Sequence, residues 1–452
     1  MTRKSPRSIP LLGPDVVLLA MAALGGGPGT AGTPSSNAVL ALELAGTVER
    51  DRVAKALDRF LAICPWLGGR LVRPRPWGRL CWRVPRGGPI PPPIVTTTLD
   101  NRSEHALAAV TDGELAATID PRREPPLRVT LATDGSRTHL VLTWAHALMD
   151  PHGSEHLLRL LATLDESGAE PFATRPVVVA PPETRPLRER GALATKSVAH
   201  LKTLAPVPPR SLAAKPHETA PPGPRHWRFR FSADAAPTDR LRHGMPWRLA
   251  VVATAMRALF AERGLATDVP FLIPVSVNRR PRGEHGPVLG NYLAFHFARA
   301  LPPADTDPMP LARALRDQLA DAVRNDELEA AWAGLGFARW RPLRALFREL
   351  PWTESGDFCS FHFADTDALL PDRTHLFGAP LVDGYHVAVV PARPGAGIFF
   401  GRRGAVESVV VSTTDGALDD ADARRIADIV GEAMGWRRLD QEARGVDGPA
   451  RA

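Results

Sequence analysis

Cysteine is scarce in this chain of 452 residues, and long apolar runs are absent. The three cysteines, Cys64, Cys81 and Cys359, lie far apart and are odd in number, which argues against a disulfide framework and indicates a reducing, cytoplasmic compartment. No apolar stretch approaches the ~20 residues that a membrane-spanning helix needs. The chain also lacks a His-Glu-x-x-His motif and paired cysteines, so the usual sequence signatures of a zinc site are missing.

Lysine is also scarce, because 51 of the 56 basic residues are arginine, and the formal net charge is +7. A positive balance favours anionic partners, such as phosphates, an acidic protein or a membrane surface in peripheral contact. Nucleic acid is disfavoured, since the arginines are scattered and no basic helix with interleaved aromatic residues is found.

The N-terminus has features of a secretory signal peptide. Basic residues up to Arg7 precede an apolar run over residues 16–24 and then small residues. Pro14 and Asp15 lie between the basic and apolar parts, which suits such a signal poorly. We therefore expect this segment to begin the folded protein, and a cleaved signal is the alternative.

The stretch 138–164 combines an apolar strand, a histidine and a helix. Trp144 and His146 continue the apolar alternation of the strand, so His146 is predicted to lie on a buried face. Desolvation of the imidazole favours its neutral form, which can act as a base. Asp150 follows in the turn, and Ser154 is predicted to cap a helix with an inward stripe of leucines. The alternative for His146 is an ordinary core histidine.

The spacing His-x-x-x-Asp between strand and helix resembles the active-site motif of the chloramphenicol-acetyltransferase-like superfamily. Its members include condensation domains of peptide synthetases, BAHD acyltransferases and wax ester synthase/diacylglycerol acyltransferases. They join an acyl thioester to an alcohol or an amine. The resemblance implies that His146 deprotonates the acceptor, while Asp150 binds an arginine and shapes the loop.

Other segments resemble the same families in the same order along the chain. Arg280 lies in the strand and turn 271–282 where relatives have Val-Asp-x-Arg or Gly-Arg-Pro, and is the expected partner of Asp150. Gly290 and Asn291 match the Gly-Asn that opens the next strand. The remaining matches are the start of the chain (Leu12 to Asp15), Pro65 with Leu67 and Leu71, residues 126–128, and residues 377–380.

Two residues depart from the usual His-His-x-x-x-Asp-Gly. Ala145 replaces the first histidine, which matters little because the second is the base. Pro151 replaces the glycine and restricts the backbone of the turn. Gly153 is expected to supply the missing freedom.

The site residues expected from the resemblance are therefore His146 and Asp150, with Arg280 behind them. Trp144, Gly153 and Asn291 are candidates for substrate binding or for the oxyanion site, with a simple turn as the alternative for Asn291. We expect no metal and no bound cofactor. The expected partners are an acyl-CoA or an acyl-carrier protein in trans as the donor, and an alcohol or amine as the acceptor.

The expected fold class is α/β, with two similar-sized sandwich halves forming a pseudo-dimer and an active-site tunnel at their junction. Residues 1–166 would form the first half with the motif, and residues 167–225, rich in proline, a crossover containing a helix at 192–204. Residues 226–452 would form the second half. Its expected strands are 226–231, one that begins at residue 271 and ends in the turn of 271–282, 357–363, 384–391, 397–401 and 406–412. Its expected helices are 247–263, 418–434 and others between 308 and 350.

Two other functions are compatible with the sequence. One is a catalytically silent protein of the same fold that only binds its ligands, an alternative prompted by Pro151. The other is a metal-dependent hydrolase that uses the cluster His146, Asp150, His152, Glu155 and His156. Zinc analysis of the purified protein and thiol release from acyl-CoAs separate these alternatives from an acyltransferase.

Overall fold

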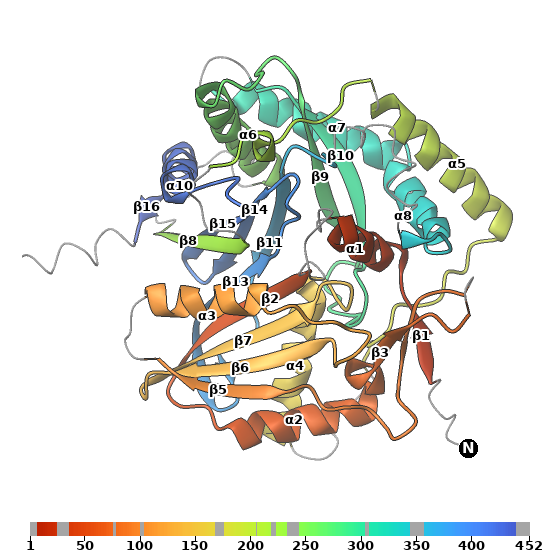
Figure 1. The fold of residues 1–452 in the computed structure, drawn as a ribbon, viewed down its shortest axis with the longest axis vertical. Helices are drawn as coiled ribbons and strands as arrows, with labels where there is room; N and C mark the ends of the chain where they lie inside the picture. Colours follow the sequence, from red (N-terminus) through yellow and green to blue (C-terminus); the bar gives the residue numbers. More distant parts are fainter. Residues whose placement is uncertain are drawn as a thin grey trace, which may run out of the picture.

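The chain folds into two α/β lobes, each built on one large sheet (Figure 1). The computed structural model describes residues 7–24, 36–75, 78–99, 104–167, 176–204, 206–217, 223–232, 244–302, 307–343 and 357–439. Within these residues no helix is both long and apolar enough to cross a bilayer.

The sheet of the first lobe has six strands in the order β12-β13-β2-β7-β6-β5. They are β2 (Asn37–Ala45), β5 (Ile94–Thr98), β6 (Leu127–Thr133), β7 (Arg137–Ala145), β12 (His375–Leu376) and β13 (Ala379–Ala388). Its helices are α2 (Arg50–Ile63), α3 (Glu104–Ala116) and α4 (Pro151–Ser167). Strand β2 is buried on both faces: Leu40 and Leu42 pack in the core with α2 and α4, whereas Val39 and Ala41 pack with Leu115 of α3.

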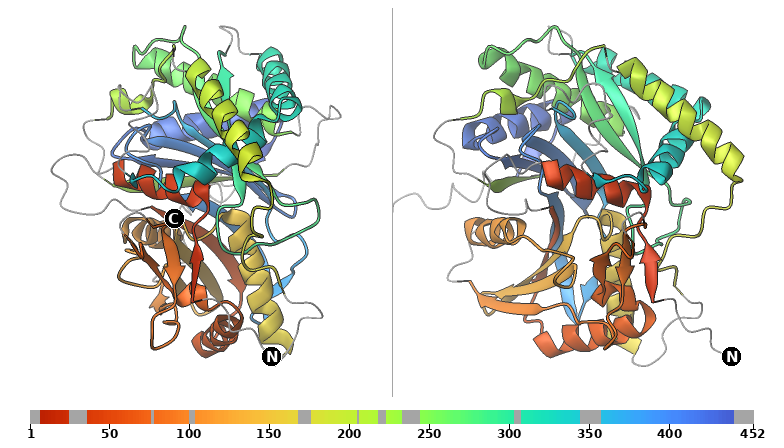
Figure 2. Two further views of the ribbon diagram at one scale, coloured as in Figure 1. Left: turned by 90° about the vertical axis from the view of Figure 1, so that its right-hand side faces the viewer. Right: turned by 45° about the vertical axis from the view of Figure 1, so that its right-hand side comes forward.

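A small sheet and the first helix complete this lobe. Strands β1 (Ser8–Pro10), β4 (Cys81–Arg83) and β3 (Arg70–Val72) form a three-stranded sheet, and β3 follows the 3-10 turn η1 (Pro65–Gly68) that ends helix α2. Helix α1 (Gly13–Leu24) follows β1 and lies at the level where the two lobes meet in all views of Figures 1 and 2.

The second lobe contains a seven-stranded sheet in the order β10-β9-β11-β14-β15-β8-β16. Its strands are β8 (Pro224–Ser232), β9 (Phe271–Asn278), β10 (Leu293–Ala300), β11 (His362–Ala368), β14 (Ala396–Arg403), β15 (Val406–Thr414) and β16 (Arg437–Arg438). Helices α6 (Met245–Glu262), α7 (Met309–Arg324) and α10 (Asp420–Met434) belong to this lobe. Helix α5 (Leu187–Leu204), from the crossover, packs on α8 (Glu327–Ala338), and α8 also contacts β10.

Strand β13 connects the lobes, because it belongs to the second half of the chain yet pairs with β2 along residues 381–388. In Figure 1 its blue ribbon reaches into the lobe of red, orange and yellow elements. The division at residues 166 and 225 therefore describes the order along the chain and does not match the membership of the sheets.

Most elements lie where the sequence predicts them, and the exceptions have local causes. Strand β11 begins at His362 and not at residue 357, although Ser360 N still donates to Leu272 O of β9 over 2.8 Å. Strand β13 begins at residue 379, because Phe377 and Gly378 both have positive φ and form the two-residue turn of a hairpin with β12. Residues 168–175, 205, 218–222 and 344–350, parts of the expected crossover and helices, lie outside the described residues.

Candidate active site

His146 follows the last residue of β7 and lies at the junction of the lobes. Its backbone N–H donates to Ser36 O over 2.8 Å, which continues the pairing of β7 with β2 by one residue. Burial lowers the pKa of the imidazole, and the carbonyl of its own backbone and the charge of Asp150 offset only part of that effect. The ring is therefore neutral at pH 7, the state that a general base requires.

Asp150 forms an ion pair with Arg280 behind His146. Arg280 Nη1 lies 2.8 Å from Asp150 Oδ2, and both side chains are only 2% exposed. The same oxygen accepts a hydrogen bond from Tyr292 N over 2.8 Å. Arg280 also donates to the carbonyls of His285 and Pro287, which fixes the loop before β10. The contact expected between Asp150 and Arg280 is thus present, while the role of the pair in a reaction stays a prediction.

Asp150, not Ser154, caps helix α4. Its Oδ1 accepts from Gly153 N over 2.7 Å, and its carbonyl accepts the first helical hydrogen bond from Ser154 N. Pro151 is the first residue of the helix, where its missing N–H costs nothing and its fixed φ suits the helix. The restriction expected from Pro151 is therefore compatible with this turn, and the cap predicted at Ser154 is wrong: its hydroxyl donates to Pro151 O instead.

Gly153 does not supply backbone freedom to the turn, contrary to the expectation. It lies within α4 and is not among the glycines with positive φ. A Cβ at this position would lie 2.4 Å from Val288 O, so glycine is required for a close approach of α4 to the loop before β10. Gly153 is also not among the residues that line the cavity around His146, and its expected contact with a substrate stays a prediction.

Asn291 holds the backbone of His146 in place. Its Nδ2 donates to His146 O over 2.8 Å and to Asp15 Oδ1 over 2.9 Å. Both amide hydrogens are thus engaged by protein oxygens, yet Asn291 also lines the cavity at His146, so its expected role at an oxyanion or a substrate stays a prediction. Burial, with a smaller contribution from the charge of Asp150, raises the pKa of Asp15 to about 7, although the hydrogen bonds from Asn291 and Leu12 lower it.

Trp144 is completely buried, and its indole N–H donates to Met149 O over 2.8 Å. This bond closes the loop between β7 and α4. The ring also contributes to the wall of the cavity at His146, so Trp144 remains a candidate for contact with a substrate.

The cavity at His146 has a volume of about 220 Å³ and is lined by both lobes. Its walls come from the middle of α1, strand β2, the end of β7 and the loop after it, strands β9, β10, β11 and β14, and the end of β13. Apolar side chains predominate, among them Val17, Leu18, Val387 and Phe399. The junction of the halves is therefore where this cavity lies, as the sequence predicts for the site.

Two histidines that sequence reasoning missed share this cavity. Burial, and to a smaller extent the neighbouring His146, lower the pKa of His362 to about 4. His386 of β13 lies 3.3 Å from Glu155 Oε1 through its Nε2. Both follow the alternation of their strands, but alternation alone does not tell which face of a strand meets the other lobe.

An apolar second cavity of about 590 Å³ adjoins the first. It lies between α5, α8 and β10. Val17, Phe295 and Phe358 line both cavities, so the two cavities share this part of their walls.

The cluster proposed for a metal does not form in the part of the chain that the structure describes. Glu155 pairs with His386 and accepts from Leu370 N, while the His156 ring lies 5.9 Å from that of His285. The histidines and carboxylates of residues 146–156 do not gather their ligand atoms at one point. The metal-hydrolase alternative therefore loses its geometric basis.

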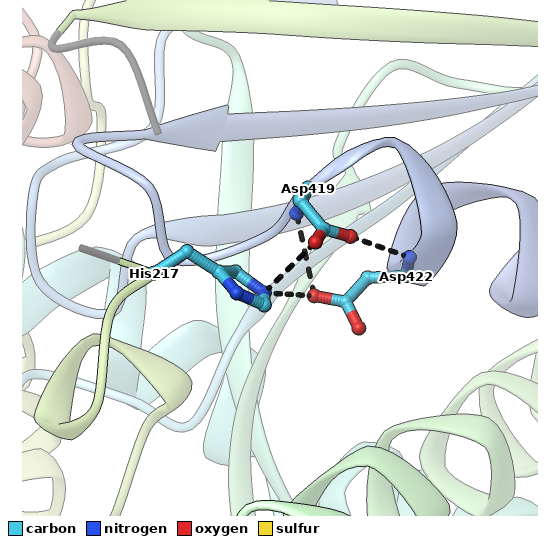
Figure 3. Close-up of side chains that lie close together, drawn as sticks. All are labelled: His217, Asp419 and Asp422. Carbon is cyan, nitrogen blue, oxygen red and sulfur yellow. Dashed lines mark hydrogen bonds and ion pairs between the residues drawn. The ribbon is translucent and has the colours of Figure 1, made fainter. Parts of the chain in front are cut away.

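The one group of described residues that satisfies the geometry of a metal site is His217, Asp419 and Asp422, whose side chains converge in Figure 3. However, Arg263 Nη2 lies 2.5 Å from His217 Nε2 and also donates to Asp422. Asp419 is the N-cap of α10 and forms a capping box with Asp422. The guanidinium of Arg263 thus occupies the place that a metal ion would take. The contacts of Arg263 with His217 and Asp422 join the start of α10 to the end of α6.

Comparisons with known proteins find similarity in structure but none in sequence. No family model matches the chain, and no curated protein matches it by sequence. Among solved structures, the starter condensation domain of rhizomide synthetase in complex with C8-CoA and Leu-SNAC has a TM-score of 0.63 at 13% identity, covering 95% of this chain and 94% of that one.

Two further solved structures give the same result. The first condensation domain of the calcium-dependent antibiotic synthetase has a TM-score of 0.63 at 15% identity, covering 96% of this chain and 97% of that one. The SgcC5 protein from Streptomyces globisporus has a TM-score of 0.61 at 16% identity, covering 94% and 99%. Together with the two lobes, these matches confirm the expected fold: the chain has the two-lobed fold of condensation domains.

Proposed function

We propose that this protein transfers an acyl group from a thioester to an alcohol or amine, with His146 as the general base. The observation that carries the proposal is a neutral, partly buried histidine in an apolar cavity at the junction of two lobes with the condensation-domain fold. The neighbour named with C8-CoA and Leu-SNAC supports a thioester donor.

The proposed reaction needs one base and a fixed geometry. His146 takes the proton from the acceptor O–H or N–H as its heteroatom attacks the thioester carbonyl. The carbon–sulfur bond then breaks, and the proton on His146 passes to the leaving thiolate. No covalent enzyme intermediate is required. A positioned base is typically worth ~10²–10⁴ in rate.

Neighbouring residues position the base in this proposal. Asn291 holds the carbonyl of His146, and Asp15 holds Asn291 in turn. Asp150 joins the start of α4 to Arg280 and to Tyr292 N. Loss of any of these contacts would move the imidazole, and displacements near 1 Å can be costly in rate.

The cavities favour an apolar acyl chain. The side chains shared by the His146 cavity and the apolar cavity beside α5 and α8 are Val17, Phe295 and Phe358. A chain bound to the thioester carbonyl at His146 would pass these residues, and burial of each methylene would contribute ~0.8 kcal/mol. We therefore propose a lipid-like or polyketide-like acyl group.

The alternative of a catalytically silent protein was prompted by Pro151, and the structure removes that reason, since Pro151 fits the first position of α4.

The proposed function is tested by the release of free thiol from a series of acyl-CoAs of increasing chain length, each with amine and alcohol acceptors. His146→Ala is expected to lower the rate by ~10² or more while leaving the melting temperature nearly unchanged. His139→Ala, a half-buried histidine on the same strand outside the cavity, is the matched control.

Three results would count against the proposal. One is a His146→Ala variant that keeps more than about a tenth of the rate, because loss of such a base costs ~10². Another is an equal loss in His139→Ala. The third is binding of acyl-CoA without thiol release in the wild type, which would restore the silent-protein alternative.

A further inference from the structure

The cavity at His146 extends to both sides of that residue. Four neighbouring strands of the second lobe line it in the order β10-β9-β11-β14, and a strand spacing of ~4.8 Å places the outer two ~14 Å apart. Phe295 of β10, which also lines the second cavity, lies at one end, and Phe399 of β14 lies at the other. His146 neighbours His362 of β11, between these two ends.

The end beside β14 contains a buried histidine–carboxylate pair that the proposed reaction does not use. His386 lines the cavity from β13, which packs against β14. Its Nε2 lies 3.3 Å from Oε1 of Glu155 of α4, and the two side chains are 7% and 3% exposed. A carboxylate-bound imidazole thus forms part of the wall of a mostly apolar cavity.

Glu155 determines which nitrogen of His386 carries a hydrogen. Burial would raise the pKa of Glu155, but its interactions with His386, His152 and Leu370 outweigh burial and hold the pKa below its usual value. An ionised carboxylate can only accept hydrogen bonds, and Glu155 also accepts one from Leu370 N over 3.1 Å. Nε2 of His386 therefore donates to Glu155, and Nδ1 of the neutral ring presents a lone pair.

The Nδ1 atom of His386 is buried and finds no hydrogen-bond partner among the residues that the structure describes. Buried polar atoms without a partner are unfavourable and are rare in native proteins. Because the same side chain lines the cavity, a bound molecule can supply the hydrogen-bond donor that the protein does not.

His386 is too far from His146 for both side chains to act on one bond. His386 pairs with Leu40 of β2, and Leu40 pairs with Leu142 of β7, four residues before His146. At ~3.4 Å per residue and ~4.8 Å per strand, the backbones of the two histidines lie ~14 Å apart along the sheet and ~10 Å apart across it. A group bound by His386 is therefore many bonds away from the reacting atoms.

We propose that the end of the cavity at His386 binds a second polar group of the acceptor, an O–H or N–H far from the nucleophile. His386 Nδ1 accepts its hydrogen bond, and Glu155 orients the imidazole and adds a negative charge that favours an ammonium. The acyl chain is assigned to the opposite end, past Phe295, so the acceptor is the substrate that reaches His386.

The acceptor class is therefore an alcohol or amine with a second hydroxyl or amino group at the far end of an apolar spacer. This inference rests on the proposed function, which supplies the acceptor.

The first experiment measures turnover of one acyl-CoA with linear amines, or with the matching alcohols if only alcohols react. Each acceptor ends in a methyl, hydroxyl, amino or carboxylate group, and each is tested in a series of increasing length. At the best length, the hydroxyl and amino ends should raise kcat/KM about fivefold or more over the methyl end, mainly through KM. The carboxylate end should bring no gain, because Glu155 repels it.

His386→Gln separates the two hydrogen bonds of the imidazole. The glutamine amide can still donate to Glu155 in place of Nε2, but it has no acceptor at the position of Nδ1. The ratio of kcat/KM between hydroxyl-ended and methyl-ended acceptors should fall to about one. His375→Gln, at an exposed histidine of β12, is the matched control and should keep the wild-type ratio.

Glu155→Gln tests the charge of the pair. Its amide oxygen still accepts from Nε2, so the preference for a hydroxyl end should remain, whereas kcat/KM for the amino end should fall about threefold relative to the hydroxyl end. Arg159, the other neighbour of Glu155, keeps its pair with Asp372. Glu166→Gln, at a half-exposed glutamate of the same helix, is the matched control and should leave both ratios unchanged.

Four results would overturn the inference. They are the absence of a preference at every length, a preference that survives in His386→Gln, a preference for the carboxylate end, and an equal loss of kcat for all acceptors in His386→Gln. The third would mean that Nδ1 donates, and the fourth that His386 acts in the reaction itself. If His386→Gln does not fold, the double variant Glu155→Gln/His386→Phe leaves no buried charge unpaired and should lose the preference as well.

The second experiment separates this inference from the proposed function. Hydroxyl-ended and methyl-ended acceptors are titrated by calorimetry, without thioester, into the full chain and into His386→Gln. If no thioester turns over but the hydroxyl-ended acceptor binds about fivefold more tightly only when His386 is present, the site stands and the acyltransferase function fails. If transfer occurs and neither affinity nor kcat/KM depends on the end group, the function stands and the site at His386 fails.

Discussion

His146 owes its chemistry to where its side chain is buried. An imidazole in water is about half charged near pH 6.5, whereas burial in the cavity favours the neutral ring. His362 across the same cavity is neutral for the same reason, with its pKa lowered to about 4. Two neutral histidines thus face one apolar space at neutral pH.

This lowered pKa predicts the pH dependence of the reaction. The base acts only when neutral, so kcat/KM should fall as the pH drops through the pKa of His146. Because that pKa lies below its ordinary value, the midpoint of the fall should lie below pH ~6.5. A pH profile of kcat/KM measures it, with His139→Ala expected to keep the same midpoint. A midpoint above the ordinary value would contradict the burial argument.

The buried pair of Asp150 and Arg280 should be a larger contributor to stability than an exposed pair. Removal of one partner leaves an uncompensated charge, so Asp150→Asn or Arg280→Ala should lower the free energy of unfolding by ~3–5 kcal/mol. The double variant should lose less than the sum of the two. Urea denaturation of the wild type, the two single variants and the double variant measures the free energy of unfolding of each protein.

An exposed pair provides the comparison for that cycle. Arg316 and Asp317 lie 2.8 Å apart with both side chains more than half exposed. Their cycle should give a coupling of at most ~1 kcal/mol. Strict additivity for Asp150 and Arg280 would show that their contact contributes nothing, and would leave Asp150 open to a direct chemical role.

At the scale of elements, the start of α4 controls the site. Asp150 caps the helix, Pro151 opens it, and Gly153 lets its first turn approach Val288. One short segment thus joins the strand that holds His146 to the loop that holds Arg280. A substitution at Gly153, which lies outside the cavity, is therefore expected to affect the site.

Gly153→Ala tests that close approach. The added Cβ would lie 2.4 Å from a backbone oxygen that cannot rotate away, so the variant should lose ~1–3 kcal/mol of stability along with activity. Gly113→Ala is the control, since Gly113 is exposed in α3 and a Cβ there would meet nothing within 4 Å. That variant should gain up to ~1 kcal/mol, because alanine favours a helix more than glycine does. Thermal melts of both variants measure these changes in stability. A Gly153→Ala variant as stable as the wild type would contradict the close approach of α4 to Val288.

At the scale of the whole molecule, the lobes are connected by β13 and by a buried hydrogen-bonded chain. His226 of β8 contacts Asp112 of α3 at 2.6 Å through Nδ1, and Tyr385 of β13 at 3.0 Å through Nε2. Burial raises the pKa of Tyr385 to about 12, so its hydroxyl stays protonated. Three distant segments of the chain therefore meet in one network between the lobes.

This connection predicts that the first half cannot fold by itself. A fragment of residues 1–217 would lack β13 and leave the backbone of β2 unpaired on one side, together with an open apolar face. It should show no cooperative melt, whereas the full chain should unfold in a single transition. Calorimetry measures both, and a sharp melt of the fragment would show that β13 is dispensable.

The sequence by itself determined the local elements and the place of the motif. Alternation predicted β7 and leucine spacing predicted α4, because these signals depend on residues close together in the chain. The two lobes were expected from the resemblance, whose motifs follow one another along the chain. The sequence also pointed to Asp150 and Arg280, although through resemblance and not through physics.

Only the tertiary structure decided what surrounds His146. The insertion of β13 beside β2 brings His386 to the cavity, and a loop 145 residues further along the chain brings Asn291 to its carbonyl. The same packing pairs His386 with Glu155 of α4, 231 residues apart along the chain. Contacts of this kind depend on how whole sheets and helices pack, and no local pattern of residues records which faces will meet.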